Sequence, residues 1–185
     1  DFPAVLDGRV IKREFPEDQR PSFYCKAINQ RRERFRDLRV RQAIARCFDF
    51  EWINRNIFYG LYRRNQSPFE SSPYKAEGLP GPEELAILEP LRGKIPEEAF
   101  GEAVVQPTTD GTGNDRRNLR EAARLMHEAG WTLKDGFLHN EKGERFTVEY
   151  LVNDETFLRI SPGFIRNLRS IGIDATIRQD RKSVV

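Results

Sequence analysis

The stretch that decides the fold spans residues 37–60 and reads DLRVRQAIARCFDFEWINRNIFYG. Its first half repeats apolar side chains at the spacing of one helix face: Val40, Ala43, Ile44, Cys47 and Phe48. Asp37 precedes this face and is suited to accept hydrogen bonds from the first backbone N–H groups of a helix. A second helical run follows Asp49, and Gly60 stands where a glycine would end it. The stretch therefore predicts two helices in succession.

Two further helical patterns lie downstream. The more regular one begins at Asp115 and ends at Gly130. The other covers residues 157–171 and contains Pro162, which should kink or restart the helix because proline has no N–H to donate.

Strand-like runs separate these helices. They occupy residues 137–139 and 146–152, and we expect the turn at 140–143 to join them as a hairpin. A further strand is expected at 173–178. Strands that alternate with helices predict an α/β fold, a mixed sheet with flanking helices.

The rest of the chain is less regular. Residues 9–15 and 23–28 read as two strands, and residues 61–81 read as a long loop rich in proline, glycine and serine. Pro82 and Pro96 each precede two glutamates, the arrangement that favours a helix start. Because long loops often carry function, the loop is a candidate binding segment.

The composition is that of a soluble globular protein with a heavily charged surface. Of the 185 residues, 38% are hydrophobic and 32% charged, and 31 Lys and Arg against 29 Asp and Glu leave a net charge of +2. No apolar run is long enough to span a bilayer, and the N-terminus has no signal-like segment. The chain opens on Asp1 without an initiator methionine, and we interpret both ends as cut.

The reactive residue types form no recognisable catalytic or metal-binding motif. Cys25 and Cys47 are interpreted as two small, partly buried thiols, and His127 and His139 lie in different elements without ligand spacing. The loop 110–115, DGTGND, lacks the spacing of a phosphate-binding loop and is interpreted as a loop that ends in a helix cap. We therefore predict no enzyme, no catalytic residue, no cofactor and no metal.

An arginine cluster leaves one alternative open. Six arginines lie between residues 31 and 41: Arg31, Arg32, Arg34, Arg36, Arg39 and Arg41. Such a cluster is able to grip phosphates, so a small basic nucleic-acid-binding module is the alternative function. Because Glu33 and Asp37 are interleaved, a solvated face or a local ion-pair network is the competing interpretation.

Three ordered blocks resemble one protein family. Residues 35–60 resemble the block D-x-R-V-R-Q-A … D-x-x-x-I … G of family 5 extracellular solute-binding proteins, the oligopeptide and dipeptide receptors of ABC importers. Residues 119–131, LREAARLMHEAGW, resemble the family's A-x-x-L-L-x-x-A-G-W/Y helix, and residues 168–175, LRSIGIDA, its L-x-x-I-G-I-x-V junction. Segments 67–72 and 109–113 look most like the branch that takes up microcin C and related oligopeptides.

The resemblance implies one lobe of a bilobed, type II periplasmic binding protein. Residues 1–28 would enter the lobe as a strand segment, residues 29–180 would form the second, C-terminal lobe, and residues 181–185 would be a tail of uncertain origin. The implied protein is a periplasmic monomer that captures oligopeptides or peptide-like solutes between its lobes. Its partners would be the permease subunits of an ABC transporter, with no nucleic acid and no membrane insertion. Arg39 and Arg41 then become structural ion-pair candidates.

A peptide receptor needs polar and aromatic groups that face its cleft. On this reasoning the predicted ligand contacts are Tyr24, Asn29, Phe69, Ser71 and Ser72.

Overall fold

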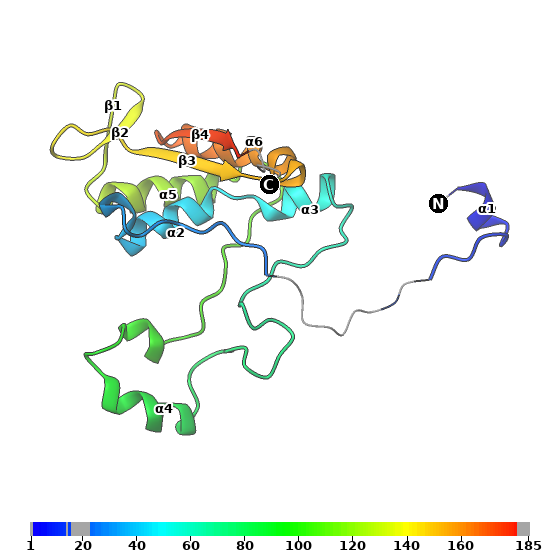
Figure 1. Cartoon of the computed structure of the whole chain (residues 1–185), viewed down its shortest axis with the longest axis horizontal. Coiled ribbons are helices and arrows are strands. Elements are labelled where there is room, and N and C mark those ends of the chain that lie inside the picture. Colours follow the sequence, from blue (N-terminus) through cyan, green and yellow to red (C-terminus); the bar gives the residue numbers. More distant parts are fainter. Residues whose placement is uncertain (1, 14, 16–22, 181–185) are drawn as a thin grey trace, which may run out of the picture. The chain divides into compact units, whose positions relative to one another are not determined.

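The computed structural model describes residues 2–13, 15 and 23–180 (Figure 1). Contacts along the chain divide it into two compact units. The smaller unit comprises residues up to 24 together with 65–104, and the larger unit comprises 25–64 together with the residues from 105 onward.

Among its described residues, the smaller unit contains short helical segments and no strand: α1 (Pro3–Leu6), α4 (Pro82–Leu88) and the 3-10 helices η2 (Glu89–Leu91) and η3 (Glu97–Phe100). The predicted helix start at Pro82 is confirmed, and the Gly81 N–H donates to the Glu84 carboxylate at 2.8 Å. The segment after Pro96 forms the 3-10 helix η3. Residues 61–81 contain neither helix nor strand, as predicted. None of the four helical segments buries a residue, so hydrophobic burial stabilises this unit little.

The two strands predicted near the N-terminus are not formed. Residues 9–13, 15 and 23–28 belong to no strand, while residue 14 lies outside the described part. An extended segment becomes a strand only when its backbone groups pair with a neighbour. In the described part of the chain the named strands pair only with one another, in two separate two-stranded sheets.

The larger unit begins with two helices from the stretch that opened the sequence. They are α2 (Leu38–Arg46), which follows the 3-10 turn η1 (Glu33–Phe35), and α3 (Phe50–Asn56). Asp37 caps α2 by accepting the Arg39 N–H at 2.8 Å, and Asp49 caps α3 by accepting the Trp52 N–H at 2.9 Å. Both predicted helices are confirmed.

The core of the larger unit forms where α2 meets α5 (Arg116–Glu128). Asp115 caps α5, and Gly130 follows it with a φ of +86°, as the sequence predicts. The apolar faces of the two helices are closed to solvent, including Val40 and Ala43 on α2 and Met126 on α5. These helices and the strands beyond them share one hydrophobic cluster.

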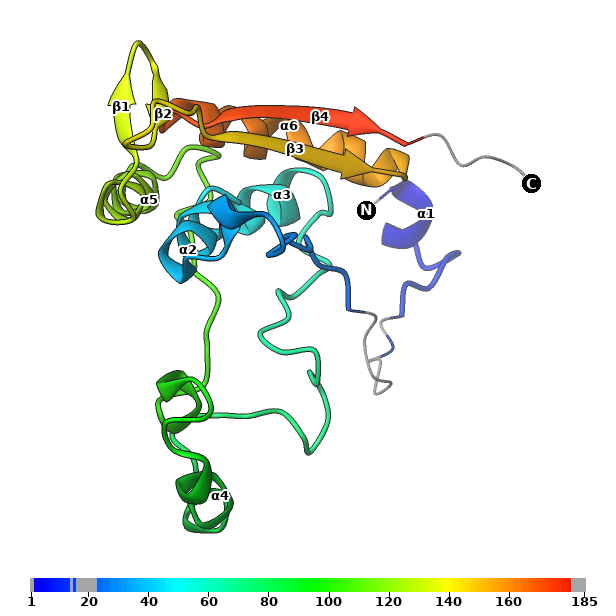
Figure 2. The same cartoon turned by 60° about the vertical axis from the view of Figure 1, so that its left-hand side comes forward.

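A parallel βαβ unit completes the larger unit. β3 (Thr147–Val152) is followed by α6 (Glu155–Ser170) and β4 (Asp174–Gln179), and the strands pair in parallel from Thr147 opposite Asp174 to Val152 opposite Gln179. Figure 2 shows β3 and β4 side by side with α6 against them. The helix runs through Pro162 and is not restarted there. Since β1 and β2 are antiparallel, the predicted mixed α/β class is confirmed, with two small sheets in place of one.

The predicted hairpin between residues 137–139 and 146–152 is wrong. β2 (Phe137–His139) pairs instead with β1 (Thr132–Lys134), through the turn at Asp135 and Gly136, whose φ values are +50° and +82°. Two successive residues of positive φ suit a two-residue hairpin, and Asp-Gly is a favoured sequence for it. Of the expected pairing there remain the bridge between His139 and Arg145 and the hydrogen bond from the Phe146 N–H to the Leu138 carbonyl at 2.8 Å, because β3 has β4 as its partner.

Candidate functional site

Four of the five predicted ligand contacts belong to the smaller unit. The Ser72 hydroxyl donates to the Phe69 carbonyl at 2.7 Å, and Ser71 has a φ of +57°, so Phe69, Ser71 and Ser72 share one tight turn. The Phe69 and Tyr74 rings meet edge to face with centroids 6.4 Å apart, and both rings are exposed. Tyr24 is also exposed. This turn therefore presents aromatic and hydroxyl groups to solvent.

The fifth residue, Asn29, lies in the larger unit. Its side-chain oxygen accepts the Arg31 N–H at 3.1 Å, which closes a local turn. The structure thus brings three of the five predicted residues together and shows a structural role for Asn29.

A group that sequence reasoning missed lies on the same segment as Asn29. The Lys26 ammonium sits 4.0 Å from the ring centroid of Phe48, 5.1 Å from that of Tyr150 and 5.4 Å from that of Phe164. The rings come from the connection between α2 and α3, from β3 and from α6. Phe48 and Tyr150 each meet Phe164 edge to face, at 5.8 and 5.9 Å. We call Lys26 and these three rings the lysine cluster.

Arg64 adds a second cation beside the lysine cluster. Its guanidinium lies 5.9 Å from the Phe48 centroid and donates to the Pro107 carbonyl at 2.5 Å. Burial lowers the pKa of Lys26 to about 8, and the positive charge of Arg64 acts in the same direction. Burial also lowers the pKa of Arg64, which the charges of Glu51 and Asp49 partly oppose. The lysine cluster is therefore a partly desolvated site of positive charge.

A second polar site fills the loop before α5. The buried Asp49 carboxylate accepts the Gly113 N–H at 2.7 Å in addition to the Trp52 N–H that it caps. The Thr109 hydroxyl bonds to the carboxylates of both Asp49 and Glu51, and the Thr109 N–H donates to Glu51 at 3.0 Å. We call this arrangement the Asp49 network. It ties the loop to the start of α3.

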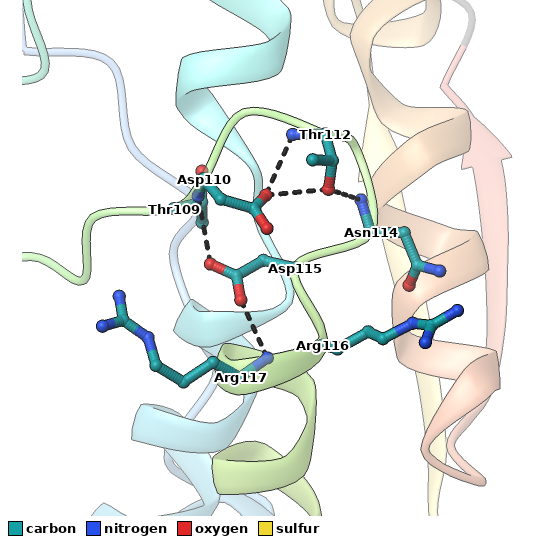
Figure 3. Close-up of a pocket in the computed structure, with 7 residues that line it drawn as sticks. All are labelled: Thr109, Asp110, Thr112, Asn114, Asp115, Arg116 and Arg117. Carbon is teal, nitrogen blue, oxygen red and sulfur yellow. Dashed lines mark hydrogen bonds between the residues drawn. The ribbon is translucent and has the colours of Figure 1, made fainter.

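The same loop borders an open cavity of about 640 Å³ (Figure 3). Asp115 accepts the N–H groups of Asp110, Arg117 and Asn118 at 2.9–3.1 Å. Asp110 in turn accepts from the Thr112 N–H and hydroxyl at 3.0 and 2.7 Å. Because these carboxylates already bind the chain's own donors, the predicted loop-and-cap interpretation is confirmed.

Two glycines allow this loop to approach α3. Gly111 and Gly113 have φ values of +71° and +82°. A Cβ atom at Gly111 would lie 2.9 Å from a terminal nitrogen of Arg55, and one at Gly113 would lie 3.2 Å from the Trp52 ring. Both positions therefore need glycine for backbone conformation and for space.

Two arginines of the cluster, Arg39 and Arg41, serve the fold. Arg39 pairs with Asp37 at 2.6 Å and donates to the Glu128 carbonyl at 2.6 Å, so its predicted ion pair is confirmed. The Arg39 guanidinium lowers the pKa of Asp37. Arg41 instead donates to the carbonyls of Arg36 and Phe35 at 2.6 and 3.0 Å, so its predicted ion pair is wrong. These two arginines hold η1, α2 and α5 together.

No group of three or more histidine, cysteine or acidic side chains that could hold a metal occurs within residues 2–13, 15 and 23–180. His139 contacts the Phe137 carbonyl at 3.1 Å through Nδ1. Cys47 is buried, which raises the pKa of its thiol, whereas Cys25 is exposed and not partly buried as predicted. Among the described helices, none has the length and apolarity that crossing a membrane requires.

The chain combines a mixed α/β fold with a turn that exposes aromatic and hydroxyl groups. Residues 5–184 match the family described as "Bacterial extracellular solute-binding proteins, family 5 Middle", and the chain belongs to that family.

Curated relatives match along nearly the whole chain. The "Probable peptide-binding protein YejA" of Agrobacterium fabrum is 39% identical over 181 residues, which is 96% of this chain and 30% of the relative. The "Peptidoglycan-binding protein YepA" of the same organism is 35% identical over 179 residues, 96% of this chain and 29% of the relative. The chain thus spans less than a third of these relatives.

Solved structures match in fold. A substrate-binding protein of an ABC transporter from Sinorhizobium meliloti has a TM-score of 0.57 at 20% identity, over 85% of this chain and 26% of that one. The oligopeptide-binding protein of Thermus thermophilus, solved with a pentapeptide, has a TM-score of 0.53 at 22% identity, over 81% of this chain and 21% of that one.

Proposed function

We propose that the protein carrying this chain is the substrate-binding component of a peptide ABC importer. It captures oligopeptides or peptide-like solutes between two lobes, which close on the ligand, and delivers them to the permease. The single observation that carries this proposal is the 39% identity to a probable peptide-binding protein along 96% of the chain. The chemistry is noncovalent, so the protein needs neither a catalytic residue nor a cofactor.

The proposal also covers the cellular location of the protein, its oligomeric state and its division into lobes. We propose a periplasmic monomer in which residues 29–180 belong to the second lobe and residues 1–28 lead into it. Membership of an extracellular solute-binding family supports the location. Residues 181–185 lie outside the described part.

For ligand contact we propose Tyr24, Asn29, Phe69, Ser71 and Ser72. The exposed turn that holds Phe69, Ser71 and Ser72 supports the last three. Hydroxyl groups and aromatic faces bind peptide main chains without reading the side chains, as an oligopeptide receptor must.

The test is calorimetric binding of a peptide panel to the complete gene product, with whatever sequence precedes and follows residues 1–185. The panel contains unmodified oligopeptides and peptidoglycan stem peptides, because one relative is named for peptidoglycan binding. We expect saturable binding with a 1:1 ratio. A protein that binds no member of the panel contradicts the proposal, and binding of stem peptides alone assigns it to cell-wall fragments.

Phe69→Ala sharpens this test. Loss of an aromatic contact worth about 1.5 kcal/mol weakens peptide affinity about tenfold. The matched control is Ile87→Ala, another exposed apolar residue of the smaller unit, which should leave affinity unchanged. Equal affinities for both variants and the parent protein would remove Phe69 from the ligand contacts.

The contacts of three of the six clustered arginines argue against the nucleic-acid alternative. Arg39 and Arg41 bond to the chain's own carboxylate and carbonyl groups, and Arg34 donates to the Thr147 carbonyl at 3.3 Å. A phosphate-binding surface needs guanidinium groups that are free to meet phosphates.

A further inference from the structure

The lysine cluster contains a cation that lacks an anion. Within residues 2–13, 15 and 23–180, Lys26 takes part in no ion pair, and its polar contacts are the three ring faces. The neighbouring charge is that of Arg64, which is also positive. Lys26 is therefore half-buried next to a second cation, and no carboxylate of the described residues pairs with it.

This arrangement is unfavourable for the folded chain alone. Removing an ammonium from water costs free energy, and ring faces return only part of it. A neighbouring cation raises that cost further. The ordinary outcome in a fold is a carboxylate beside the lysine, as at Lys75, which pairs with Glu70 at 2.9 Å and Glu77 at 3.0 Å. At Lys26 the described part of the chain supplies no such carboxylate, so the position of the counter-ion is open to a group from outside the chain.

The ammonium is also reachable. In the described part of the chain, the fully enclosed side-chain nitrogens and oxygens that lack a hydrogen bond are Arg46 Nε and Asn167 Oδ1. Lys26 Nζ is not one of them, so it keeps contact with solvent. A ligand group that approaches from that side is able to accept its hydrogen bonds.

The lysine cluster lies against the parallel strand β3 and the helix α6. Tyr150 lies in the second half of β3, which ends at Val152, and Phe164 lies on the helix that follows this strand. Open α/β sheets bind ligands outside the carboxyl ends of their parallel strands. Through its contact with the Tyr150 ring, Lys26 lies beside the second half of β3.

We propose that Lys26 binds a carboxylate of the ligand, with Arg64 adding positive potential at the same place. The ammonium donates to the carboxylate oxygens while the three rings exclude water around the pair, which strengthens it. This inference rests on the proposed function and adds a ligand class to it: peptides or peptide-like solutes that carry a carboxylate at this position.

The test uses the complete gene product and matched peptides. A peptide identified by the panel is measured as the free acid, as the C-terminal amide, and with its acidic side chains replaced by amides. These forms separate a C-terminal carboxylate from a side-chain carboxylate. We expect one of the two changes to weaken binding about tenfold to a hundredfold, the range for a charge-assisted hydrogen bond.

The variants then locate the effect. Lys26→Met keeps the length and apolar stem, and should bind the free acid and its weaker amide form equally. Lys26→Arg keeps the charge and should retain most of the discrimination. Lys142→Met removes an exposed lysine from a turn and should behave as the parent protein. Full discrimination in Lys26→Met overturns the inference while leaving peptide binding intact, whereas a parent protein that binds no peptide overturns the proposed function and the inference with it.

A measurement on the unmutated protein covers the case in which Lys26→Met does not fold. The charge of Arg64 lowers the pKa of Lys26 and Cys25 acts in the opposite direction, while burial raises the pKa of the neighbouring Tyr150 phenol. In a Cys25→Ser background, affinity for the carboxylate form should fall as the pH rises above 8, and affinity for the amide form should not. Parallel pH profiles for the two forms contradict the inference.

Discussion

The Asp49 network and the lysine cluster lie in the same unit and treat charge in opposite ways. Asp49 is buried, and its carboxylate accepts hydrogen bonds from Trp52, Thr109 and Gly113. Lys26 is half-buried, and its ammonium meets only ring faces beside a second cation. The fully hydrogen-bonded carboxylate of Asp49 stabilises the fold, whereas the ammonium of Lys26, which has no counter-ion among the described residues, is available to bind a ligand.

Removing the Asp49 carboxylate should have the largest effect on stability. Asp49→Ala deletes the α3 cap and leaves the buried Gly113 N–H without its acceptor, while the Thr109 hydroxyl keeps only the Glu51 carboxylate. We expect the free energy of unfolding to fall by about 3 kcal/mol, the sum of a lost cap and one buried unpaired donor. Urea unfolding measures the loss, and hydrogen exchange should place it at α3 and the loop before α5.

Asp110→Ala is the matched control for Asp49→Ala. Asp110 is an exposed carboxylate of the same loop, and its side chain bonds only to Thr112, two residues away. We expect its loss to cost under about 1 kcal/mol. Similar losses at both positions would show that burial of Asp49 does not distinguish the two carboxylates.

Removing the Lys26 charge should stabilise the fold. The pKa of this lysine is lowered to about 8 by burial, so at pH 7 the folded protein holds an ammonium at a free-energy cost. We expect Lys26→Met to raise the free energy of unfolding by about 2 kcal/mol at pH 7, since methionine also fills an apolar place. Equal stability of the two proteins would mean that the rings already compensate the charge.

The pH dependence of stability tests whether the charge of Lys26 destabilises the fold. Between pH 8 and the ordinary lysine value of 10.5, the unfolded chain keeps a proton on Lys26 that the folded chain has lost. The free energy of unfolding of the parent protein therefore rises with pH in this window relative to that of Lys26→Met, and the stability difference between the two proteins becomes smaller. Unfolding curves at pH 7 and pH 10 measure it, and a gap that widens toward pH 10 contradicts the assignment.

The contrast between the two sites also explains what the sequence could predict. The caps Asp37, Asp49 and Asp115 were predictable because a cap and its helix are neighbours in the chain. The family resemblance was predictable for the same reason, since each of its blocks is a continuous run of residues. The hairpin is misassigned because the two-residue turn Asp135-Gly136 pairs β2 with β1, in preference to the longer turn at 140–143.

The lysine cluster could not be predicted in this way. Its rings stand at positions 48, 150 and 164, and only the packing of β3 and α6 brings them to Lys26. One sequence signal existed: Lys26 interrupts the apolar run from Phe23 to Ile28. A lone charge in such a run indicates a cation that is partly removed from water, but not what surrounds it.

Of Asp49→Ala, Lys26→Met and Gly113→Ala, the last should have the smallest effect, and it tests the structural half of the comparison most directly. The substitution places a side chain at a φ of +82° and a Cβ atom 3.2 Å from Trp52. Gly143→Ala is the matched control, because its φ of +79° is similar while no atom lies within 4 Å of the added Cβ. Each should lose about 1 kcal/mol from the backbone, and Gly113→Ala about 0.5 kcal/mol more from the ring contact. Because the loop serves the fold, peptide affinity should stay unchanged in both variants. A selective loss of affinity in Gly113→Ala, without the extra loss of stability, would make the loop a ligand site. The Asp49 network and the lysine cluster would then no longer differ in role.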